Sequence, residues 1–101
     1  MIPSGIVTFL FTDVEGSTQL WAADSEAMSV SLQTHDEVLR REFESRGGYV
    51  FTTAGDSFAV AFSRATDAVA AAEAAQVALA GAAWPGPVLR VRMGIHLGEA
   101  E

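Results

Sequence analysis

Two aspartates in this sequence stand beside turn signals, where a carboxylate can bind a cation. Asp13 follows a run of β-branched and aromatic residues, and Asp56 follows a glycine between two similar runs. Carboxylate oxygens are the ligands that hard divalent cations prefer. Asp13 and Asp56 are therefore candidate metal ligands, and the alternative is that they are an ordinary helix-cap and hairpin aspartate.

The residues that follow Asp13 are suited to holding an anion. The segment Gly16-Ser17-Thr18 precedes the apolar Leu20 and Trp21, a pattern that predicts the start of a helix. The free N–H groups of a first helical turn favour a negatively charged group. An acid that favours a cation, beside amides that favour an anion, predicts a metal-chelated phosphate as the ligand.

Two helices and one strand are expected around this segment. The strand runs from about Gly5 to Thr12, a short helix from Ser17 to Ala22, and a long helix from Ser25 to Arg46. Gly47-Gly48 ends the long helix, because glycine accepts the left-handed conformation at a helix C-terminus. Residues at steps of three and four predict its buried face, on which His35 is interpreted as a packed histidine: Met28, Leu32, His35, Leu39 and Phe43.

The second half of the sequence predicts a hairpin, a helix and a final strand. Tyr49–Thr53 and Ser57–Phe62 flank Ala54-Gly55-Asp56, and a glycine between two strand-like runs favours a hairpin. An alanine-rich helix from Ala65 to Ala80 follows, with Val69, Val77 and Leu79 expected on its packing side. The last strand, Val88–His96, alternates apolar and polar residues, so that one of its faces is expected to be buried.

The order of these elements is that of a ferredoxin-like βαββαβ fold, which is an α+β sandwich with helices on one face of an antiparallel sheet. Residues 1–101 form one domain in this interpretation. The first and third strands of such a unit lie side by side and antiparallel in the centre. This arrangement is expected to bring Asp13 and Asp56 together.

Composition excludes several classes of function. The 101 residues carry a net charge of −7 and include no cysteine. An acidic chain is a poor general nucleic-acid binder, and the absence of cysteine excludes disulfides and thiolate metal sites. The N-terminal residues lack a signal-peptide pattern, and no apolar run approaches the roughly 20 residues of a membrane helix. We therefore expect a soluble, cytoplasmic domain without a nucleic-acid or membrane partner.

Three segments, in this order, resemble the catalytic domain of class III adenylate and guanylate cyclases of the bacterial type. They are Phe9–Thr18, Gly47–Phe58 and Arg90–Ala100. The resemblance spans essentially the whole chain. It implies a lyase domain that converts ATP, or GTP, to a 3′,5′-cyclic nucleotide and pyrophosphate in intracellular signalling.

The resemblance also implies roles for individual residues. Two divalent cations, Mg²⁺ or Mn²⁺, would be held by Asp13, Asp56 and the Val14 carbonyl, and Ca²⁺ is expected to bind without turnover. The two cations activate the ribose 3′-hydroxyl and neutralise the triphosphate. Nucleotide-binding positions would be Phe11, Thr52 and Gly55 together with the phosphate-facing amides of Glu15, Gly16, Ser17 and Thr18.

Two departures from the family pattern bear on activity. Thr52 stands where the family commonly has a lysine that reads adenine, and it does not supply the acid that is usual in guanylate cyclases. The sequence given ends at Glu101, before the segment that supplies a second base-reading residue, an asparagine and an arginine. Because cyclase domains form head-to-tail dimers with complementary halves of each site, low turnover is expected unless a partner cyclase domain supplies that half.

The alternative to a cyclase is a non-catalytic module that binds metal and nucleotide or mediates dimerisation. Other proteins with a similar sheet are disfavoured. Diguanylate cyclases carry a Gly-Gly-acid-Glu-Phe hairpin, which Ala54-Gly55-Asp56-Ser57 lacks. The RNA-binding version of this topology needs paired aromatic and basic residues on its sheet, and this sequence does not show that signature.

Overall fold

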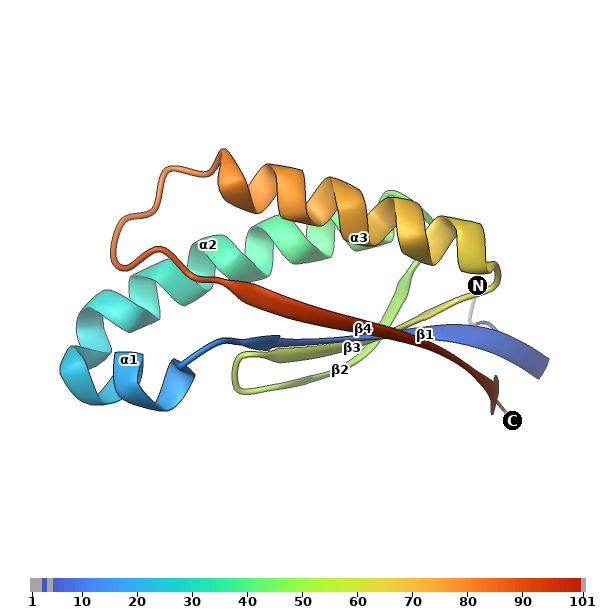
Figure 1. Cartoon of the computed structure of the whole chain (residues 1–101), viewed down its shortest axis with the longest axis horizontal. Helices are drawn as coiled ribbons and strands as arrows, with labels where there is room; N and C mark the ends of the chain where they lie inside the picture. The colour runs from blue at the N-terminus through green and yellow to red at the C-terminus, as the bar shows by residue number, and fades with distance from the viewer. Residues whose placement is uncertain (1–2, 4, 101) are drawn as a thin grey trace.

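The computed structural model describes residue 3 and residues 5–100, and its elements follow the predicted order (Figure 1). The bounds are β1 Gly5–Val14, α1 Ser17–Ala23, α2 Ser25–Glu44, β2 Tyr49–Ala54, β3 Ser57–Phe62, α3 Ala65–Ala80 and β4 Val91–Ala100.

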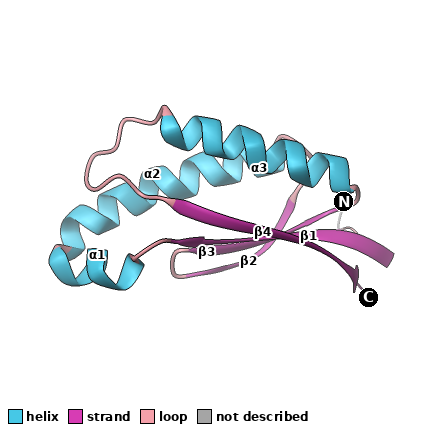
Figure 2. Ribbon diagram, viewed as in Figure 1, coloured by secondary structure: helices cyan, strands magenta, loops and turns pink. Residues whose placement is uncertain are grey.

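The four strands form one antiparallel sheet in the order β2-β3-β1-β4. Helices α2 and α3 lie over one face of this sheet, and within the described part of the chain no helix lies over the other face (Figures 1 and 2). The predicted ferredoxin-like α+β fold, with β1 and β3 adjacent in the centre, is confirmed. We call the two sides the helix-covered face and the open face.

The core lies between the helices and the helix-covered face. Leu10 of β1 stands opposite Val60 of β3, and both are fully buried. Phe43 of α2 and Phe62 of β3 are the largest side chains buried there. Replacing such a phenylalanine by alanine costs about 3–5 kcal/mol, so these residues hold α2 on the sheet. His35 is also fully buried in α2, as predicted.

The strands β1 and β4 differ from their predicted extents by more than one residue. β1 continues past Thr12 to Val14, so that Asp13 lies within the strand. β4 begins at Val91 rather than at Val88 and continues to Ala100. Its apolar side does not stay buried, since Ile95 is 40% and Leu97 67% exposed. The reason is that β4 is an edge strand whose C-terminal end curves away from the helices (Figure 1).

The packing side of α3 includes Leu79, as predicted, but not the two predicted valines. Its buried residues are Ala68, Ala71, Ala75 and Leu79, whereas Val69 is 48% and Val77 75% exposed. Alanines at the contact allow α3 to approach the sheet and α2 closely, and the larger valines lie outside. Trp21, which the sequence marks as an apolar residue at the helix start, is 38% exposed on the short helix α1.

None of the helices among the described residues combines the length and the apolar character needed to cross a membrane.

Candidate functional site

Asp13 lies near the C-terminal end of β1, on the open face. Because side chains alternate along a strand, Asp13 shares this face with Phe9 and Phe11, while Thr12 and Val14 point to the opposite side. The β1–β4 register places Asp13 directly opposite Arg92. The Asp13 side chain is 47% exposed, so it is accessible to a ligand.

Arg92 holds both carboxylate oxygens of Asp13. Its Nε donates to Oδ1 and its Nη2 to Oδ2, each at 2.8 Å. These hydrogen bonds hold the pKa of Asp13 below its ordinary value and raise the pKa of Arg92. No local sequence pattern predicts this pair, because the contact depends on the register between two strands and its residues are 79 positions apart in the sequence.

Asp56 lies at the tip of the β2–β3 hairpin. Ala54 pairs with Ser57, which leaves Gly55 and Asp56 as a two-residue turn. Gly55 has φ +61°, while Asp56, like every described non-glycine residue, has a negative φ. A glycine with positive φ at the first position, followed by a residue with negative φ, is typical of a type II′ turn, which suits the twist of paired strands. Gly55 therefore provides the backbone conformation that the turn requires, and the turn places Asp56 at the tip of the hairpin.

Both aspartates line one pocket of about 510 Å³. The pocket lies between the end of β1, the start of α1 and the tip of the hairpin. Among the candidate site residues it brings together Asp13, Val14, Gly16, Ser17, Thr18 and Asp56, and it adds Gln19, Ser57 and Arg92. The expected proximity of Asp13 and Asp56 is therefore found.

Glu15 does not join the other phosphate candidates. Its N–H donates to the carbonyl oxygen of Arg90 at 2.8 Å, and its side chain lies beside a different hollow. Gly16, with φ 68°, forms the N-cap of α1 without a side-chain cap, and Gly16, Ser17 and Thr18 line the pocket. The amide of Glu15 is thus engaged within the protein in this structure.

A second, more apolar pocket of about 620 Å³ continues from the first over the open face. The two share Asp13, Ser57 and Arg92. The second pocket contains Phe11 and Thr52, two of the predicted nucleotide-binding positions, and it also contains Phe58, Met93 and Gly94. A flat aromatic ring suits such a surface, while a phosphate suits the polar pocket beside it. Gly55 lines neither pocket.

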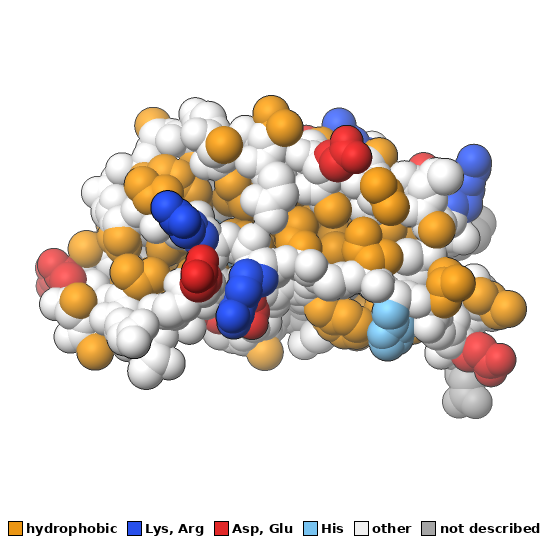
Figure 3. Space-filling model, in the orientation of Figure 1, with side chains coloured by type: hydrophobic (Ala, Val, Ile, Leu, Met, Phe, Trp, Pro, Cys, Tyr) orange, Lys and Arg blue, Asp and Glu red, His pale blue; other side chains and the backbone are white. Residues whose placement is uncertain are grey.

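Aromatic side chains gather on the rest of the open face. Phe9 contacts Phe11, Phe51 and His96, with ring centroids 5.8–6.0 Å apart. Phe11 and Phe51 are 43% and 45% exposed. Figure 3 shows a small group of acidic and basic side chains next to a largely apolar and uncharged surface.

The donor set partly fits divalent cations. Two carboxylates and the nearby backbone of Val14 offer oxygen atoms, as Mg²⁺, Mn²⁺ and Ca²⁺ require. Among the described residues there is no group of three or more histidine, cysteine or acidic side chains that could hold a metal ion. Oxygen atoms of a phosphate would have to complete the coordination, and Arg92 would have to release Asp13 at least in part.

The sequence matches the family model of the adenylate and guanylate cyclase catalytic domain over residues 1–100. The chain belongs to this family.

Curated relatives of this cyclase-family chain are much longer proteins. It is 38% identical to an adenylate cyclase of Podospora anserina over 117 aligned residues, which cover 96% of this chain and 6% of that protein. It is 37% identical to an uncharacterized protein of Mycobacterium tuberculosis over 102 residues, covering 98% of this chain and 33% of that protein.

Solved structures show the same fold. A Trypanosoma brucei adenylate cyclase, described in its monomeric state, is 28% identical with a TM-score of 0.89, and covers 99% of this chain and 59% of that one. The guanylate cyclase domain from Catenaria anguillulae, solved in complex with GTP, is 18% identical with a TM-score of 0.83. It covers 97% of this chain and 59% of that one. This chain therefore spans less than two thirds of the length of these relatives.

Proposed function

We propose that this chain is the metal-binding half of an adenylate cyclase-like site, which converts ATP to 3′,5′-cyclic AMP and pyrophosphate. The observation that carries the proposal is the single pocket that contains Asp13, Asp56 and the start of α1. A metal-chelated triphosphate satisfies the acids and the amides together. Membership of the cyclase family supports the assignment.

The chain's own residues have distinct tasks in this proposal. Asp13, Asp56 and the Val14 carbonyl hold two divalent cations, Mg²⁺ or Mn²⁺, and Ca²⁺ binds there without turnover. The amides from Gly16 to Thr18 face the phosphates, and Phe11 and Thr52 border the base. When bound, the cations lower the pKa of the ribose 3′-hydroxyl and neutralise charge on the phosphates. Arg92 would have to release the Asp13 carboxylate at least in part for the cations to bind there.

The partner in this proposal is a second cyclase domain in a head-to-tail arrangement, either another copy or a different chain. The aromatic open face and the open pockets beside it support this arrangement, because an exposed apolar surface of this kind marks an interaction site. One of the solved relatives with this fold is described as a non-canonical dimeric guanylyl cyclase domain. The partner supplies the groups that stabilise the transition state.

A second candidate function is a module that binds metal and nucleotide without turnover. Thr52 favours it, since a short uncharged side chain at the pocket reads a base edge weakly. The described residues around the two pockets include one arginine, Arg92, which is already paired with Asp13.

The two candidates differ in a paired assay. Cyclic AMP and cyclic GMP are measured with Mn²⁺ and either ATP or GTP, for the chain alone and with a partner cyclase domain. Calorimetry measures binding of an ATP analogue in parallel. Cyclic AMP that disappears in Asp13→Asn and Asp56→Asn supports the cyclase. Binding without product supports the module, and the absence of both overturns both proposals.

The matched control for these variants is Asp67→Asn. Asp67 is an acid in the first turn of α3, far from the pocket residues in the fold. Its replacement by asparagine removes the same charge as the two site variants. Activity and binding are expected to survive this change.

A further inference from the structure

Thr12 borders the apolar pocket of the open face, but its side chain lies on the face opposite to the candidate metal ligand Asp13. It immediately precedes Asp13 in β1, and alternation along the strand turns the two side chains to opposite faces. Asp13 is accessible on the open face, whereas Thr12 is 4% exposed on the helix-covered face. Any effect of the Thr12 side chain on a ligand at Asp13 must therefore act through the backbone.

The Thr12 hydroxyl joins the two segments that carry the acids. Its Oγ1 accepts a hydrogen bond from the backbone N–H of Phe58 at 3.1 Å, in a buried environment. Thr12 precedes Asp13 by one residue, and Phe58 follows Asp56 by two. The bond is therefore a short bridge between the backbone that carries one aspartate and the backbone that carries the other.

This bridge stands where the two strands separate. Thr12 and Phe58 are the last pair in the β1–β3 register. Beyond them, β1 leads through Asp13 toward α1, and the start of β3 leads back through Ser57 to the hairpin turn. The pocket opens in this fork. The spacing of the two aspartates depends on how the fork is closed at its base.

Phe58 is a firm anchor for the bridge because α2 holds its ring. His35 meets the ring edge-on with centroids 5.7 Å apart and an interplanar angle of 82°. Phe43 packs against the same ring at 6.3 Å, and the Arg40 guanidinium carbon lies 5.9 Å from its centroid. The hairpin tip lacks such packing, since a Cβ added at Gly55 would meet nothing within 4 Å. The position of the hairpin tip is therefore set by the packed residues at the base of the hairpin.

We propose that Thr12 is a positioning residue that sets the separation of Asp13 and Asp56 by bonding the Phe58 amide. The inference rests on the proposed function, because it assigns the site's geometry to a residue whose side chain is buried behind the site. Groups that orient metal ligands from behind typically change metal affinity 10- to 100-fold when they are removed. The hydroxyl is the essential group, so serine should replace threonine and valine should not.

The test compares Thr12→Val, Thr12→Ser and Thr8→Val with the wild-type chain. Valine keeps the branched shape and removes the acceptor. Thr8 is a matched control, since it lies on the same strand and the same face, is 2% exposed, and pairs with Phe62 away from the hairpin. Binding of Mn²⁺ with a non-hydrolysable ATP analogue is measured by calorimetry and Mn²⁺ EPR. Thr12→Val should bind at least ten-fold more weakly, with Thr12→Ser and Thr8→Val within about two-fold of wild type.

Amide hydrogen exchange provides a second measurement that does not depend on ligand. The Phe58 amide should exchange faster in Thr12→Val than in Thr8→Val, and Thr12→Ser should restore its protection. Should Thr12→Val not fold, Thr12→Ala replaces it in both measurements.

The outcomes separate the two proposals. Wild-type protein that binds no Mn²⁺–nucleotide overturns the proposed function and this inference with it. Wild-type binding that is weakened equally by Thr12→Val and Thr8→Val, or by neither, overturns only the positioning role.

Discussion

Asp13 is held by a guanidinium at the position where the proposed function requires a metal ion. The bidentate pair with Arg92 is a charge-assisted contact that also fixes the orientation of the carboxylate. Both side chains are exposed, at 47% for Asp13 and 65% for Arg92, so the pair is weak enough for a divalent cation to displace it. Arg92 therefore neutralises the charge of Asp13 and, under the proposed function, competes with a cation for this carboxylate.

Removing this competitor should strengthen binding of a bare metal ion. We expect Arg92→Gln to bind Mn²⁺, in the absence of nucleotide, up to roughly five-fold more tightly, because an exposed ion pair contributes about 1 kcal/mol or less. EPR titration of free Mn²⁺ measures the change. Arg90→Gln is the control, since Arg90 is exposed and has no hydrogen bond to Asp13. Weaker binding by Arg92→Gln would show that Arg92 does not compete with the metal.

The sequence pointed to Asp13 and Asp56 as candidate site residues, but it did not point to Arg92 as the partner of Asp13. Asp13 and Asp56 carry local signals, a strand end with a glycine after it and a hairpin glycine before it, and the fold type then places them together. Arg92 looks like any polar residue of an alternating strand. Its contact with Asp13 follows from the exact β1–β4 register, which no local pattern contains.

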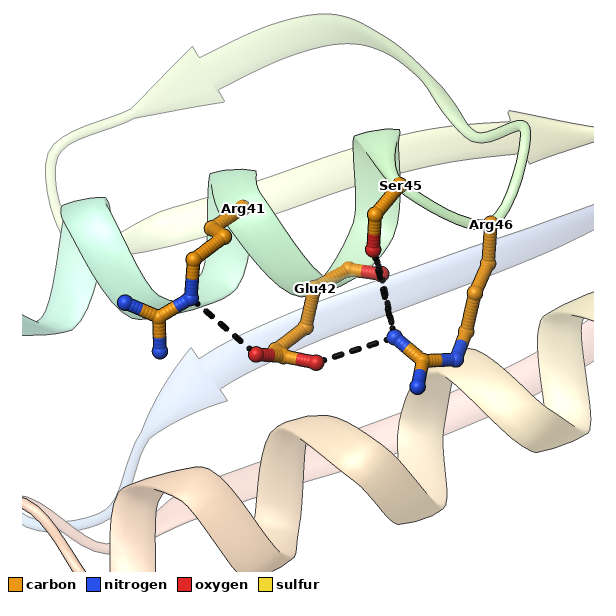
Figure 4. Close-up of polar contacts among 4 residues, drawn as sticks. All are labelled: Arg41, Glu42, Ser45 and Arg46. Carbon is orange, nitrogen blue, oxygen red and sulfur yellow. Dashed lines mark hydrogen bonds and ion pairs between the residues drawn. The ribbon is translucent and has the colours of Figure 1, made fainter.

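Helix α2 carries a charged cluster near its C-terminus (Figure 4). Glu42 accepts from Arg41 Nε at 3.1 Å and from Arg46 Nη1 at 2.9 Å, and the Arg46 group also donates to the Ser45 hydroxyl at 3.2 Å. Arg41 first, and then Arg46, hold the pKa of Glu42 below its ordinary value. The cluster joins the last turn of α2 to the segment that leads into β2.

This cluster makes a prediction about pH. Because the folded pKa of Glu42 is depressed, its contribution to stability is present above the unfolded value, 4.5, and is lost as pH falls through the folded pKa. Carboxyl NMR titration should find Glu42 below that value. Arg41→Gln should raise its pKa toward the ordinary value, and Arg46→Gln should raise it less. The Arg40–Glu44 pair provides the control, since Arg40→Gln should leave Glu42 unchanged.

The connection from α3 to β4 is pinned to α2 by a close backbone approach. Ser31, fully buried, donates to the Pro87 carbonyl at 2.7 Å and accepts from the Gly86 N–H at 3.1 Å. A Cβ at Gly86 would lie 2.2 Å from the Ala27 carbonyl oxygen. Only glycine permits this contact, which sets the path of the chain into β4.

Gly86→Ala should therefore destabilise the protein by about 1–3 kcal/mol, the usual cost of overpacking. Gly81→Ala is the control, because a Cβ there meets its nearest atom at 3.7 Å and the backbone φ is −94°. That change should be neutral or stabilise by up to about 1 kcal/mol. Urea unfolding measures both. Equal midpoints for the two variants would mean that the loop adapts without cost.

Elements with strong local patterns were predicted well, and those whose burial depends on neighbours were not. The amphipathic repeat of α2 placed Met28, His35 and Phe43 inside, as found. In α3, alanines occupy most positions, so hydrophobicity alone favoured the valines for the core. Close helix packing instead selected the alanines, which is a tertiary effect that the pattern does not show.

The described residues form one layer of helices on a sheet whose other face is uncovered (Figure 1). The aromatic residues on the open face are supported by the sheet below and covered by nothing among the described residues. The order of elements sufficed to predict this two-layer arrangement, including which strands are central. It could not predict that aromatic side chains would cluster on the uncovered side, since that depends on cross-strand register.

Self-association through the open face should depend on Phe51. We expect sedimentation velocity to show a dimer at high protein concentration, and Phe51→Glu to weaken it at least ten-fold, since buried aromatics dominate interface energies. Val77→Glu is the control, because Val77 is 75% exposed on α3 in the opposite layer. A dimer that persists in Phe51→Glu and dissociates in Val77→Glu would place the interface on the helices.

The pairing of β1 with β4 also governs when the site can exist during biosynthesis. Gly5 pairs with Ala100 at one end of this ribbon, and Asp13 with Arg92 near the other. The ribosome synthesises β1 long before β4. The edge of β1 that pairs with β4 therefore stays unpaired while the hairpin and α3 are being synthesised. Contacts between such distant residues form slowly. Nascent chains that stop before β4 should therefore lack the wall of the pocket that Arg92 provides, whereas the β2–β3 hairpin can already have formed.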